Sequence, residues 1–183
     1  MKVLGIVGSP RKNGNTQILV NSILEGARQA GAETEMVRLA DLKIRECDGC
    51  HSCWKGRPCV KDDDMNGIYD KIAASDVIVF GTPVYWFGPT GLMKLFLDRF
   101  VYFNCPENQA MVQGKKAILA VPFEDTDLET ARPLVDMFRK SMDYLKMDLV
   151  DVLLVPGVTR KGEIKNRKED LEKGFVIGTC FSR

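Results

Sequence analysis

The sequence predicts an α/β domain in which helices cover both faces of a five-stranded parallel sheet. Short apolar runs alternate with longer segments of helical periodicity, in the order β-α-β-α-β-α-β-α-β-α. The strand runs are almost continuously apolar, which is typical of parallel strands buried between two helical layers. Right-handed crossovers then favour the strand order 2-1-3-4-5.

The first elements are well marked in the sequence. Residues 2–9 form an apolar run that ends in Gly-Ser-Pro, which predicts a buried strand. Residues 15–30 have helical periodicity, and we expect Asn15 or Thr16 to cap this helix. Residues 34–39 alternate in polarity, which predicts a strand near a sheet edge.

A long segment without periodicity, residues 41–64, follows the second strand. It ends in three aspartates, 62–64, and we expect these to cap the next helix rather than to bind a metal. The remaining helices are predicted within 65–75, 89–103, 127–147 and 165–181, and the remaining strands at 76–82, 115–123 and 149–155. These elements predict a flavodoxin-like three-layer α/β/α sandwich, in which ligands bind at the carboxyl ends of the strands.

Length and charge limit the classes of function. The 183 residues predict one domain, 1–183, with residues 41–64 as an inserted cysteine-rich loop. The net charge of +1 counts against partners such as nucleic acid or an anionic membrane. The longest apolar runs, about ten residues, are too short for a membrane span. No signal peptide is recognised, so we expect a cytoplasmic protein.

A polar loop follows the first strand and reads Gly-Ser-Pro-Arg-Lys-Asn-Gly-Asn-Thr-Gln over residues 8–17. It enters a helix N-terminus, whose backbone N–H groups lack helical partners and can bind an anion. Arg11 adds a cation, and hydrogen-bonding side chains come from Ser9, Asn13, Asn15 and Thr16. The loop fits neither a Walker A motif nor a dinucleotide fingerprint, which favours a single phosphate monoester. A plain polar connection is the alternative.

A second loop follows the third strand and reads Gly-Thr-Pro-Val-Tyr-Trp-Phe-Gly over residues 81–88. Three consecutive aromatic residues at the ligand-binding edge suit a flat heteroaromatic ring, and Gly88 permits close approach of the backbone. Packing of the rings under a neighbouring loop or subunit is the alternative. Together the two loops favour flavin mononucleotide (FMN) as the ligand.

The two loops resemble those of the flavodoxin-like NADPH-dependent FMN reductase superfamily, over residues 1 to about 155. The resemblance implies that the phosphate is held by Ser9, Arg11, Asn15, Thr16 and Gln17. It also implies that the isoalloxazine is held, largely through backbone groups, by Pro83, Val84, Tyr85, Trp86, Phe87 and Gly88. A third loop of the superfamily would lie near residues 123–125, which are unusually acidic here, and no residue is assigned in it.

Four of the six cysteines, Cys47, Cys50, Cys53 and Cys59, fall within 13 residues. Their C-x2-C-x2-C-x5-C spacing is the ferredoxin-type pattern for a 4Fe–4S cluster, whereas zinc usually takes two separated pairs. Zinc, empty thiols and a redox disulfide remain alternatives, and Cys105 or Cys180 could replace Cys59 as the fourth ligand.

Inserted after the second strand of an FMN domain, this motif resembles the iron–sulfur flavoprotein family. The resemblance implies one 4Fe–4S cluster, ligated by the four clustered cysteines, and one FMN per subunit. It also implies dimers that pair into tetramers, with the cluster of one subunit near the flavin of another. Reduced ferredoxin would be the donor and a small oxidant the acceptor. We also expect the cysteine loop to face the flavin site.

Residues 92–103 are apolar on more than one helical face, which predicts a subunit interface and hence a homodimer or homotetramer. The alternative is that residues 104–114 fold over this surface. The combined expectation is an FMN-dependent oxidoreductase that transfers electrons between the cluster and FMN, without a catalytic acid, base or nucleophile. An NAD(P)H-dependent FMN or quinone reductase without a functional cluster and a flavodoxin-like electron carrier are the alternatives.

Overall fold

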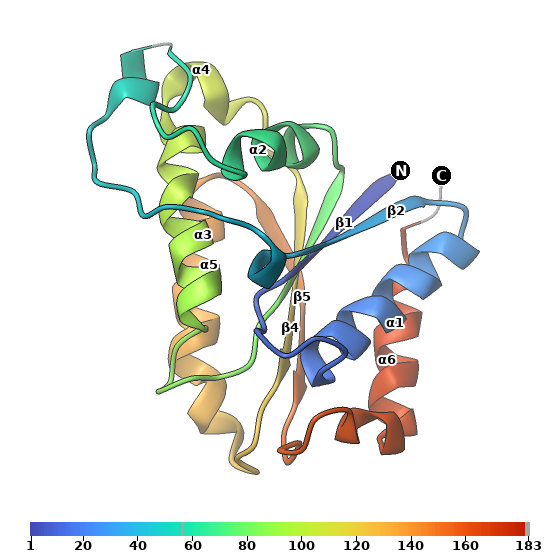
Figure 1. Cartoon of the computed structure of the whole chain (residues 1–183). Coiled ribbons are helices and arrows are strands. Elements are labelled where there is room, and N and C mark those ends of the chain that lie inside the picture. Colours follow the sequence, from blue (N-terminus) through green and yellow to red (C-terminus); the bar gives the residue numbers. More distant parts are fainter. Residues whose placement is uncertain (56, 182–183) are drawn as a thin grey trace.

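A computed structural model describes residues 1–55 and 57–181 and confirms the predicted sheet (Figure 1). Five parallel strands lie in the order β2-β1-β3-β4-β5. Their bounds are β1 Lys2–Val7, β2 Glu33–Arg38, β3 Val77–Gly81, β4 Lys116–Pro122 and β5 Asp148–Val155. The carboxyl ends of all five strands therefore meet at one edge of the sheet.

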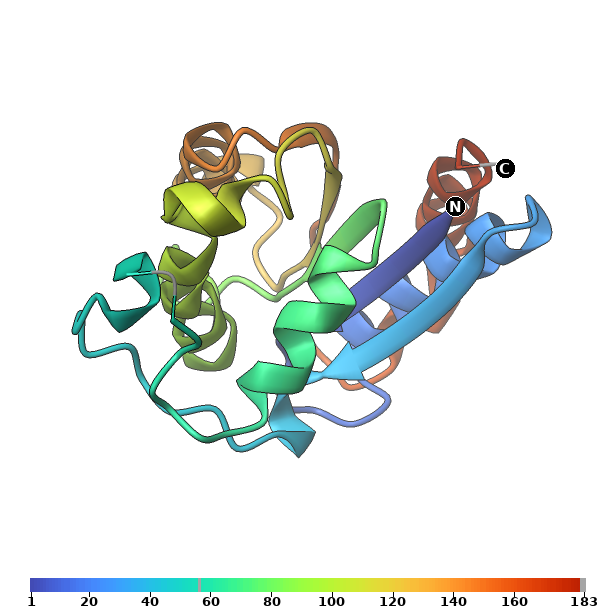
Figure 2. The same cartoon turned by 90° about the horizontal axis from the view of Figure 1, so that it is seen from above.

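Helices cover the two faces of the sheet unequally (Figures 1 and 2). One face carries α1 (Asn15–Gln29) and α6 (Lys168–Thr179). The other carries α2 (Met65–Ala73), α3 (Gly91–Asp98) and α5 (Arg132–Tyr144). A short helix that the sequence did not predict, α4 (Pro106–Gln109), follows a 3-10 segment, η3 (Arg99–Asn104). No helix in the described ranges has the length and apolar character needed to cross a membrane.

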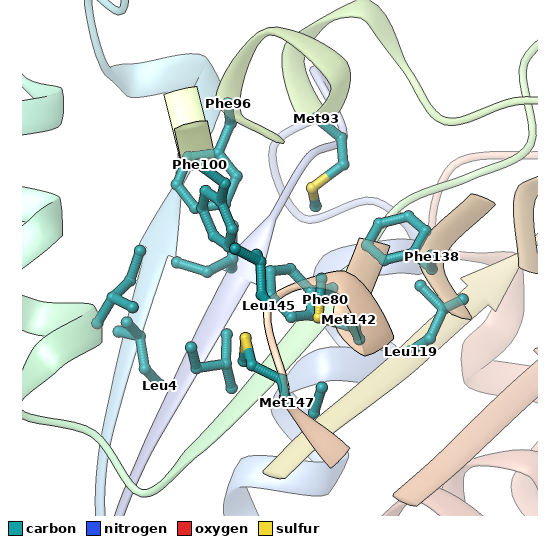
Figure 3. Close-up of a cluster of buried hydrophobic side chains, with 14 of the residues drawn as sticks. Leu4, Phe80, Met93, Phe96, Phe100, Leu119, Phe138, Met142, Leu145 and Met147 are labelled. Atoms are coloured by element: carbon teal, nitrogen blue, oxygen red, sulfur yellow. The ribbon is translucent and has the colours of Figure 1, made fainter. Parts of the chain in front are cut away.

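Alternation along the strands divides the core in two. In β1, Leu4 and Ile6 pack toward α2, α3 and α5, whereas Val3 and Val7 pack toward α1 and α6. The first of these clusters is rich in aromatic and methionine side chains, and Phe80 lies near its centre (Figure 3). The ring centroids of Phe80 and Phe138 are 5.6 Å apart. This cluster fixes the face of the sheet along which the cysteine loop runs.

Two glycines let α1 lie close to the sheet. A Cβ atom at Gly5 would come within 2.8 Å of Val20 Cγ1, and one at Gly81 within 2.3 Å of Val20 Cγ2. Both distances are shorter than real contacts, so a side chain at either position would push α1 outward. The close approach places the N-terminus of α1 at the carboxyl ends of β1 and β3.

The inserted segment 41–64 is closed at its base by the aspartates that precede α2. Lys43 N–H donates to Asp64 Oδ2 (2.6 Å), and Asp64 N–H donates to the Lys43 carbonyl (3.2 Å). The predicted capping role holds for Asp63, whose Oδ1 accepts from Met65 N–H (3.1 Å). Asp64 occupies the N-cap position itself, and its side chain does not cap the helix. The aspartates thus tie the loop ends together as well as starting α2.

Candidate functional site

Four loops at the carboxyl edge of the sheet line one pocket. The loops follow β1, β3, β4 and β5. Together with the first turn of α1 and the last residue of β4, they contribute Ser9, Arg11, Asn15, Thr16, Pro83, Val84, Tyr85, Pro122, Phe123, Glu124, Val158 and Thr159. The structure therefore brings both predicted flavin loops together, at the place where ligands of such sheets bind.

The N-terminus of α1 forms an anion-binding cradle in this pocket. Its N-cap residue is Gly14, no side chain caps the helix, and the first turn contains no acidic residue. The first-turn N–H groups and the positive end of the helix dipole thus remain directed at the pocket. A Cβ atom at Gly14 would lie 2.9 Å from the Arg11 carbonyl oxygen, so glycine keeps the turn tight. These features fit the terminal phosphate of FMN.

Asn15 is not the cap that the sequence predicted. Its Nδ2 donates to the Arg160 carbonyl (3.0 Å), and its Oδ1 accepts from Ile164 N–H (3.2 Å). The predicted capping by Asn15 or Thr16 is therefore wrong, because the Asn15 amide instead anchors the segment that follows β5. Thr16 lines the pocket and is 2% exposed.

Of the other predicted phosphate residues, Ser9 and Arg11 line the pocket, whereas Asn13 and Gln17 are not among the lining residues. Arg11 is exposed, and its Nη1 donates to the Thr159 carbonyl (3.0 Å). Asn13 has a positive φ of 56°, and its N–H donates to Gln17 Oε1 (2.7 Å). In this structure Asn13 and Gln17 shape the loop.

The predicted ring loop contains a tight hairpin. The N–H of Tyr85 donates to the Gly88 carbonyl (2.8 Å) and the N–H of Gly88 to the Tyr85 carbonyl (3.0 Å). The two residues at its tip, Trp86 and Phe87, both have positive φ, 49° and 63°, which is costly for bulky side chains. Trp86 is 96% exposed. Only Pro83, Val84 and Tyr85 of this loop line the first pocket.

A second pocket, of about 460 Å³, adjoins the first and shares Val84, Phe123 and Glu124 with it. Its other lining residues are Trp86, Phe87, Asp125 and Thr130. The N–H of Asp127 and the hydroxyl of Thr130 donate to Asp125 and lower the pKa of its carboxyl. Exposed aromatic rings and acidic residues therefore line the same pocket.

Sequence reasoning assigned no residue in the loops after β4 and β5. The structure adds Pro122, Phe123, Glu124, Val158 and Thr159 to the pocket. The available signal was topological, because the carboxyl ends of all parallel strands lie at the same edge. No sequence pattern in these loops marks a phosphate or a ring.

The four clustered cysteines converge on a different pocket. Cys47, Cys50, Cys53 and Cys59 all line it, together with Tyr69 of α2 and with Arg99, Val101 and Tyr102 of η3. The cysteine segment is tied to η3 by Trp54, whose Nε1 donates to the Val101 carbonyl (3.1 Å). Lys61 and the N–H of Cys50 hydrogen-bond to Asp48 and lower its pKa to about 2. These contacts hold the cysteine segment against η3 and join its two halves to each other.

A buried ion pair lies beside this pocket. Arg99 Nη1 donates to Asp63 Oδ2 at 2.6 Å, and the two side chains are 1% and 3% exposed. Burial alone would raise the pKa of Asp63, but hydrogen bonds from Arg99 and from the backbone of Arg45 and Met65 outweigh it and lower the pKa. Burial, reinforced by the neighbouring Cys59, raises the pKa of the Cys53 thiol.

The four clustered thiols share one pocket without forming a site for a single ion. Within the residues described, no three histidine, cysteine or acidic side chains lie close enough to bind one metal ion. A cubane instead gives each thiolate its own iron, so the sulfurs need only surround a common space. Cys105 is buried and raises the pKa of Cys53, so it lies nearby, whereas Cys180 follows α6 on the other face of the sheet.

The two pockets share no lining residue and lie at opposite ends of α3. At one end, the Thr90 hydroxyl caps α3 and donates to the Gly8 carbonyl (2.5 Å). At the other end, Arg99 reaches the thiol pocket. The eight residues of α3 that lie between these ends span about 12 Å of helix. In Figure 1 the teal cysteine segment accordingly lies far from the loops at the carboxyl edge, so within one chain it does not face the flavin site as expected.

The apolar run 92–103 is divided between core and surface. Met93, Phe96 and Phe103 are fully buried within the chain, and Asn108 Nδ2 of α4 donates to the Tyr102 carbonyl (3.1 Å). A surface pocket remains, lined by Leu97, Phe100, Val101, Asn104, Lys140, Ser141, Tyr144 and Leu145. Residues after 104 thus cover part of the run, and the subunit interface stays a prediction for the rest.

The fold, with a pocket at the carboxyl edge of its sheet, is that of a class of proteins, the flavodoxin-like flavin oxidoreductases. Residues 1–151 match the model of the NADPH-dependent FMN reductase family, and the chain belongs to that family.

Individual relatives agree with this class. An iron–sulfur flavoprotein of Methanocaldococcus jannaschii is 41% identical over 99 residues, 54% of this chain and 51% of that protein. One of Methanosarcina thermophila is 39% identical over 121 residues, 66% of this chain and 63% of that protein. The chain therefore spans about half to two thirds of the length of these relatives. These sequence identities confirm the resemblance to the iron–sulfur flavoproteins.

A solved structure shows the same fold. The structure of NAD(P)H:quinone oxidoreductase from Methanothermobacter marburgensis superposes with a TM-score of 0.81, over 100% of this chain and 96% of that one, at 18% identity.

Proposed function

We propose that this protein is an FMN-dependent oxidoreductase that transfers electrons between a 4Fe–4S cluster and FMN. The observation that carries the proposal is the convergence of Cys47, Cys50, Cys53 and Cys59 on one pocket beside a buried arginine. The same chain belongs to the NADPH-dependent FMN reductase family and has a pocket at the carboxyl edge of the sheet that would hold FMN. A thiol pocket of this kind has no function in flavin binding itself, so it points to a second redox centre.

The residues of the first pocket would hold FMN without reacting chemically. The N-terminus of α1, with Ser9, Arg11 and Thr16, would bind the phosphate. Pro83, Val84 and Tyr85 would contact one part of the ring system, and Phe123 another. When bound, FMN supplies one-electron and two-electron chemistry, and the protein orients it and excludes water.

The second pocket supports a small acceptor. It adjoins the flavin pocket, and its aromatic wall of Trp86 and Phe87 suits a flat organic oxidant. This pocket also favours an enzyme over a carrier, since a carrier needs no space beside its flavin. Reduced ferredoxin is the proposed donor to the cluster. Because α3 separates the two pockets within one chain, electron exchange would take place between the subunits of a homodimer or homotetramer.

An NAD(P)H-dependent FMN or quinone reductase without a cluster is the second candidate. The family match and the pocket of about 460 Å³ beside the flavin site favour it. The two candidates differ in their donor. Anaerobic stopped-flow mixing compares flavin bleaching by NADPH with bleaching by reduced ferredoxin. Rapid bleaching by NADPH, unchanged when the clustered cysteines are replaced, would establish the second candidate.

The central experiment is anaerobic purification followed by iron, acid-labile sulfide and flavin analysis, with EPR after reduction. We expect about four iron and four sulfide per chain, as a cubane requires. Cys50→Ala and Cys53→Ala should lose the EPR signal, whereas Cys180→Ala, on the far face of the sheet, should keep it. Iron-free wild-type protein, or a signal that survives both replacements, would rule out the cluster.

A further inference from the structure

Among the residues that the structure describes, Arg99 is the largest side chain to be fully buried, at 1% exposure. It begins η3, directly after α3, and reaches across to the cysteine segment. Its Nη1 donates to Asp63 Oδ2 (2.6 Å) and to the Arg45 carbonyl (2.9 Å). Its Nη2 donates to Cys59 Sγ (3.3 Å). One guanidinium therefore joins the segments before and after the cysteines to the fourth cysteine itself.

The burial of the charged Arg99 side chain requires a physical explanation. Burying a guanidinium is expensive, and a buried ion pair is often no more stabilising than apolar side chains of similar volume. Asp63 and the Arg45 carbonyl satisfy Nη1, but Nη2 is directed at a sulfur. A neutral thiol is a weak acceptor, whereas a thiolate is a strong partner for a guanidinium. The geometry thus suits a negatively charged sulfur at Cys59.

The other groups around Arg99 do not replace this partner. Arg45 Nε lies 4.0 Å from Asp63 Oδ2, and its side chain is 55% exposed. The ring of Tyr69 lies under the guanidinium at 5.9 Å, and the Tyr69 hydroxyl donates to the Arg99 carbonyl (3.3 Å). The carboxylate of Asp63 balances the positive charge of Arg99. The thiol pocket therefore favours additional negative charge through the Arg99 N–H groups that face Cys59, not through a net positive charge.

We propose that Arg99 is a positioning residue for the iron–sulfur cluster: it holds Cys59 as the fourth ligand and raises the reduction potential of the cluster. This inference rests on the proposed function. Hydrogen bonds to the sulfurs and local charge set the potential of such clusters. The negative charge of a thiolate-ligated cluster increases on reduction, so a donating cation stabilises the reduced state more than the oxidised state. The same contact selects Cys59 over the nearby buried Cys105, to which Arg99 makes no hydrogen bond in the described structure.

Two variants and a matched control test the role of Arg99. Arg99→Gln removes the charge, and Arg99→Lys keeps it on a single ammonium group. Arg45→Gln removes a charge from the same loop without touching a cysteine, because the Arg45 side chain contacts Asp62 and Asp63. Each protein is reconstituted anaerobically, its iron and sulfide are counted, and its midpoint potential is measured by EPR-monitored titration. Folding is checked by circular dichroism.

We expect the potential of Arg99→Gln to be more negative than that of the wild type, with Arg99→Lys in between and Arg45→Gln unchanged. If Arg99→Gln does not fold, the double variant Arg99→Gln/Asp63→Asn, which buries no unpaired charge, is measured instead; its potential should still be more negative than that of the wild type, but by less, because the donor to Cys59 is lost while the net charge is unchanged. An unchanged potential at full iron content overturns the role of Arg99.

Ligand selection is tested separately with Cys59→Ala and Cys105→Ala. Loss of iron in Cys59→Ala and full iron in Cys105→Ala support the inference, and the reverse pattern overturns it. Iron-free wild-type protein has a different meaning: it overturns the proposed function itself. Iron-loaded wild-type protein with a potential that does not depend on residue 99 overturns only the inference about Arg99.

Discussion

Single side chains in this chain often have two possible partners, and the partner they bind decides their role. Asn15 could cap α1, but its amide bonds to Arg160 and Ile164 instead. As a result the first-turn N–H groups of α1 remain available to a phosphate. Arg99 likewise shares its N–H groups between Asp63 and Cys59. At the residue scale, function follows from which donors are left for a ligand.

Replacing Arg11 with Ala should weaken FMN binding about tenfold, since a charge-assisted hydrogen bond at an exposed site contributes about 1.5 kcal/mol. The affinity is measured by flavin fluorescence titration of the apoprotein. Lys12→Ala is the control, because Lys12 is the neighbouring cation and does not line the pocket. Equal affinities for the wild type and Arg11→Ala would remove Arg11 from the phosphate site.

Replacing Asp63 with Asn should destabilise the apoprotein by about 3–5 kcal/mol at pH 7, because it leaves Arg99 buried without its counter-ion. The folded-state pKa of Asp63 lies below its usual value of 3.8, so the stability it contributes is fully present above pH 3.8 and is lost as the pH falls through the folded pKa. The difference between the wild type and Asp63→Asn should therefore shrink below pH 3.8. Urea denaturation at pH 7 and pH 3 measures it.

The neighbouring Asp62→Asn is the control for this prediction. Asp62 is exposed, and its backbone carbonyl, not its carboxylate, accepts from Arg45. Its unfolding free energy should match that of the wild type at pH 7. A pH-independent difference between the wild type and Asp63→Asn would contradict the assigned titration.

At the scale of elements, the hairpin after β3 combines an unfavourable backbone conformation with exposed aromatic side chains. Trp86 and Phe87 occupy positions with positive φ, where two-residue hairpins favour Asn-Gly. Both residues line the second pocket, which adjoins the candidate flavin site, and their side chains are exposed rather than part of the core. Local strain of this kind is maintained at functional sites. The aromatic pair is thus better explained by ligand binding than by stability.

The double variant Trp86→Asn/Phe87→Gly should raise the unfolding free energy of the apoprotein by about 1–2 kcal/mol, because both residues then suit positive φ. It should also raise the KM for a quinone acceptor, since the aromatic wall is gone. Thermal unfolding and steady-state kinetics measure the two effects. Phe87→Ala is the control: it removes a ring, keeps an unfavourable φ, and should not stabilise. A destabilised double variant would show that the rings support the fold.

At the scale of the whole molecule, exposed apolar surface remains between η3 and α5. We expect Leu97→Glu to shift the protein from an oligomer to a monomer in sedimentation equilibrium, because it places a charge in this surface pocket. Val176→Glu, on the exposed apolar surface of α6, is the control and should leave the oligomer intact. A wild-type protein that sediments as a monomer would contradict the interface.

Sequence reasoning recovered the strands, their order and the convergence of the loops after β1 and β3 at one edge of the sheet, because buried parallel strands and turn residues leave strong local patterns. It missed what depends on distant contacts. The anchoring of Asn15 requires residues 160–164, and the partnership of Arg99 with Asp63 and Cys59 spans 36 and 40 residues. It also missed α4, which has only four residues and no periodicity to detect. Non-local hydrogen bonds and very short helices have no sequence period.

The contact between α1 and α6 has a consequence for how the protein is made. A Cβ atom at Gly178 would lie 2.0 Å from the Ile23 carbonyl oxygen, so the two helices touch backbone to backbone. Arg11 and Asn15 of the phosphate cradle are also held by the carbonyls of Thr159 and Arg160. Translation at 5–20 residues per second separates these partners by on the order of ten seconds. The cradle therefore stays incomplete until residues 159–160 have been synthesised, and cofactor loading follows the synthesis of these residues.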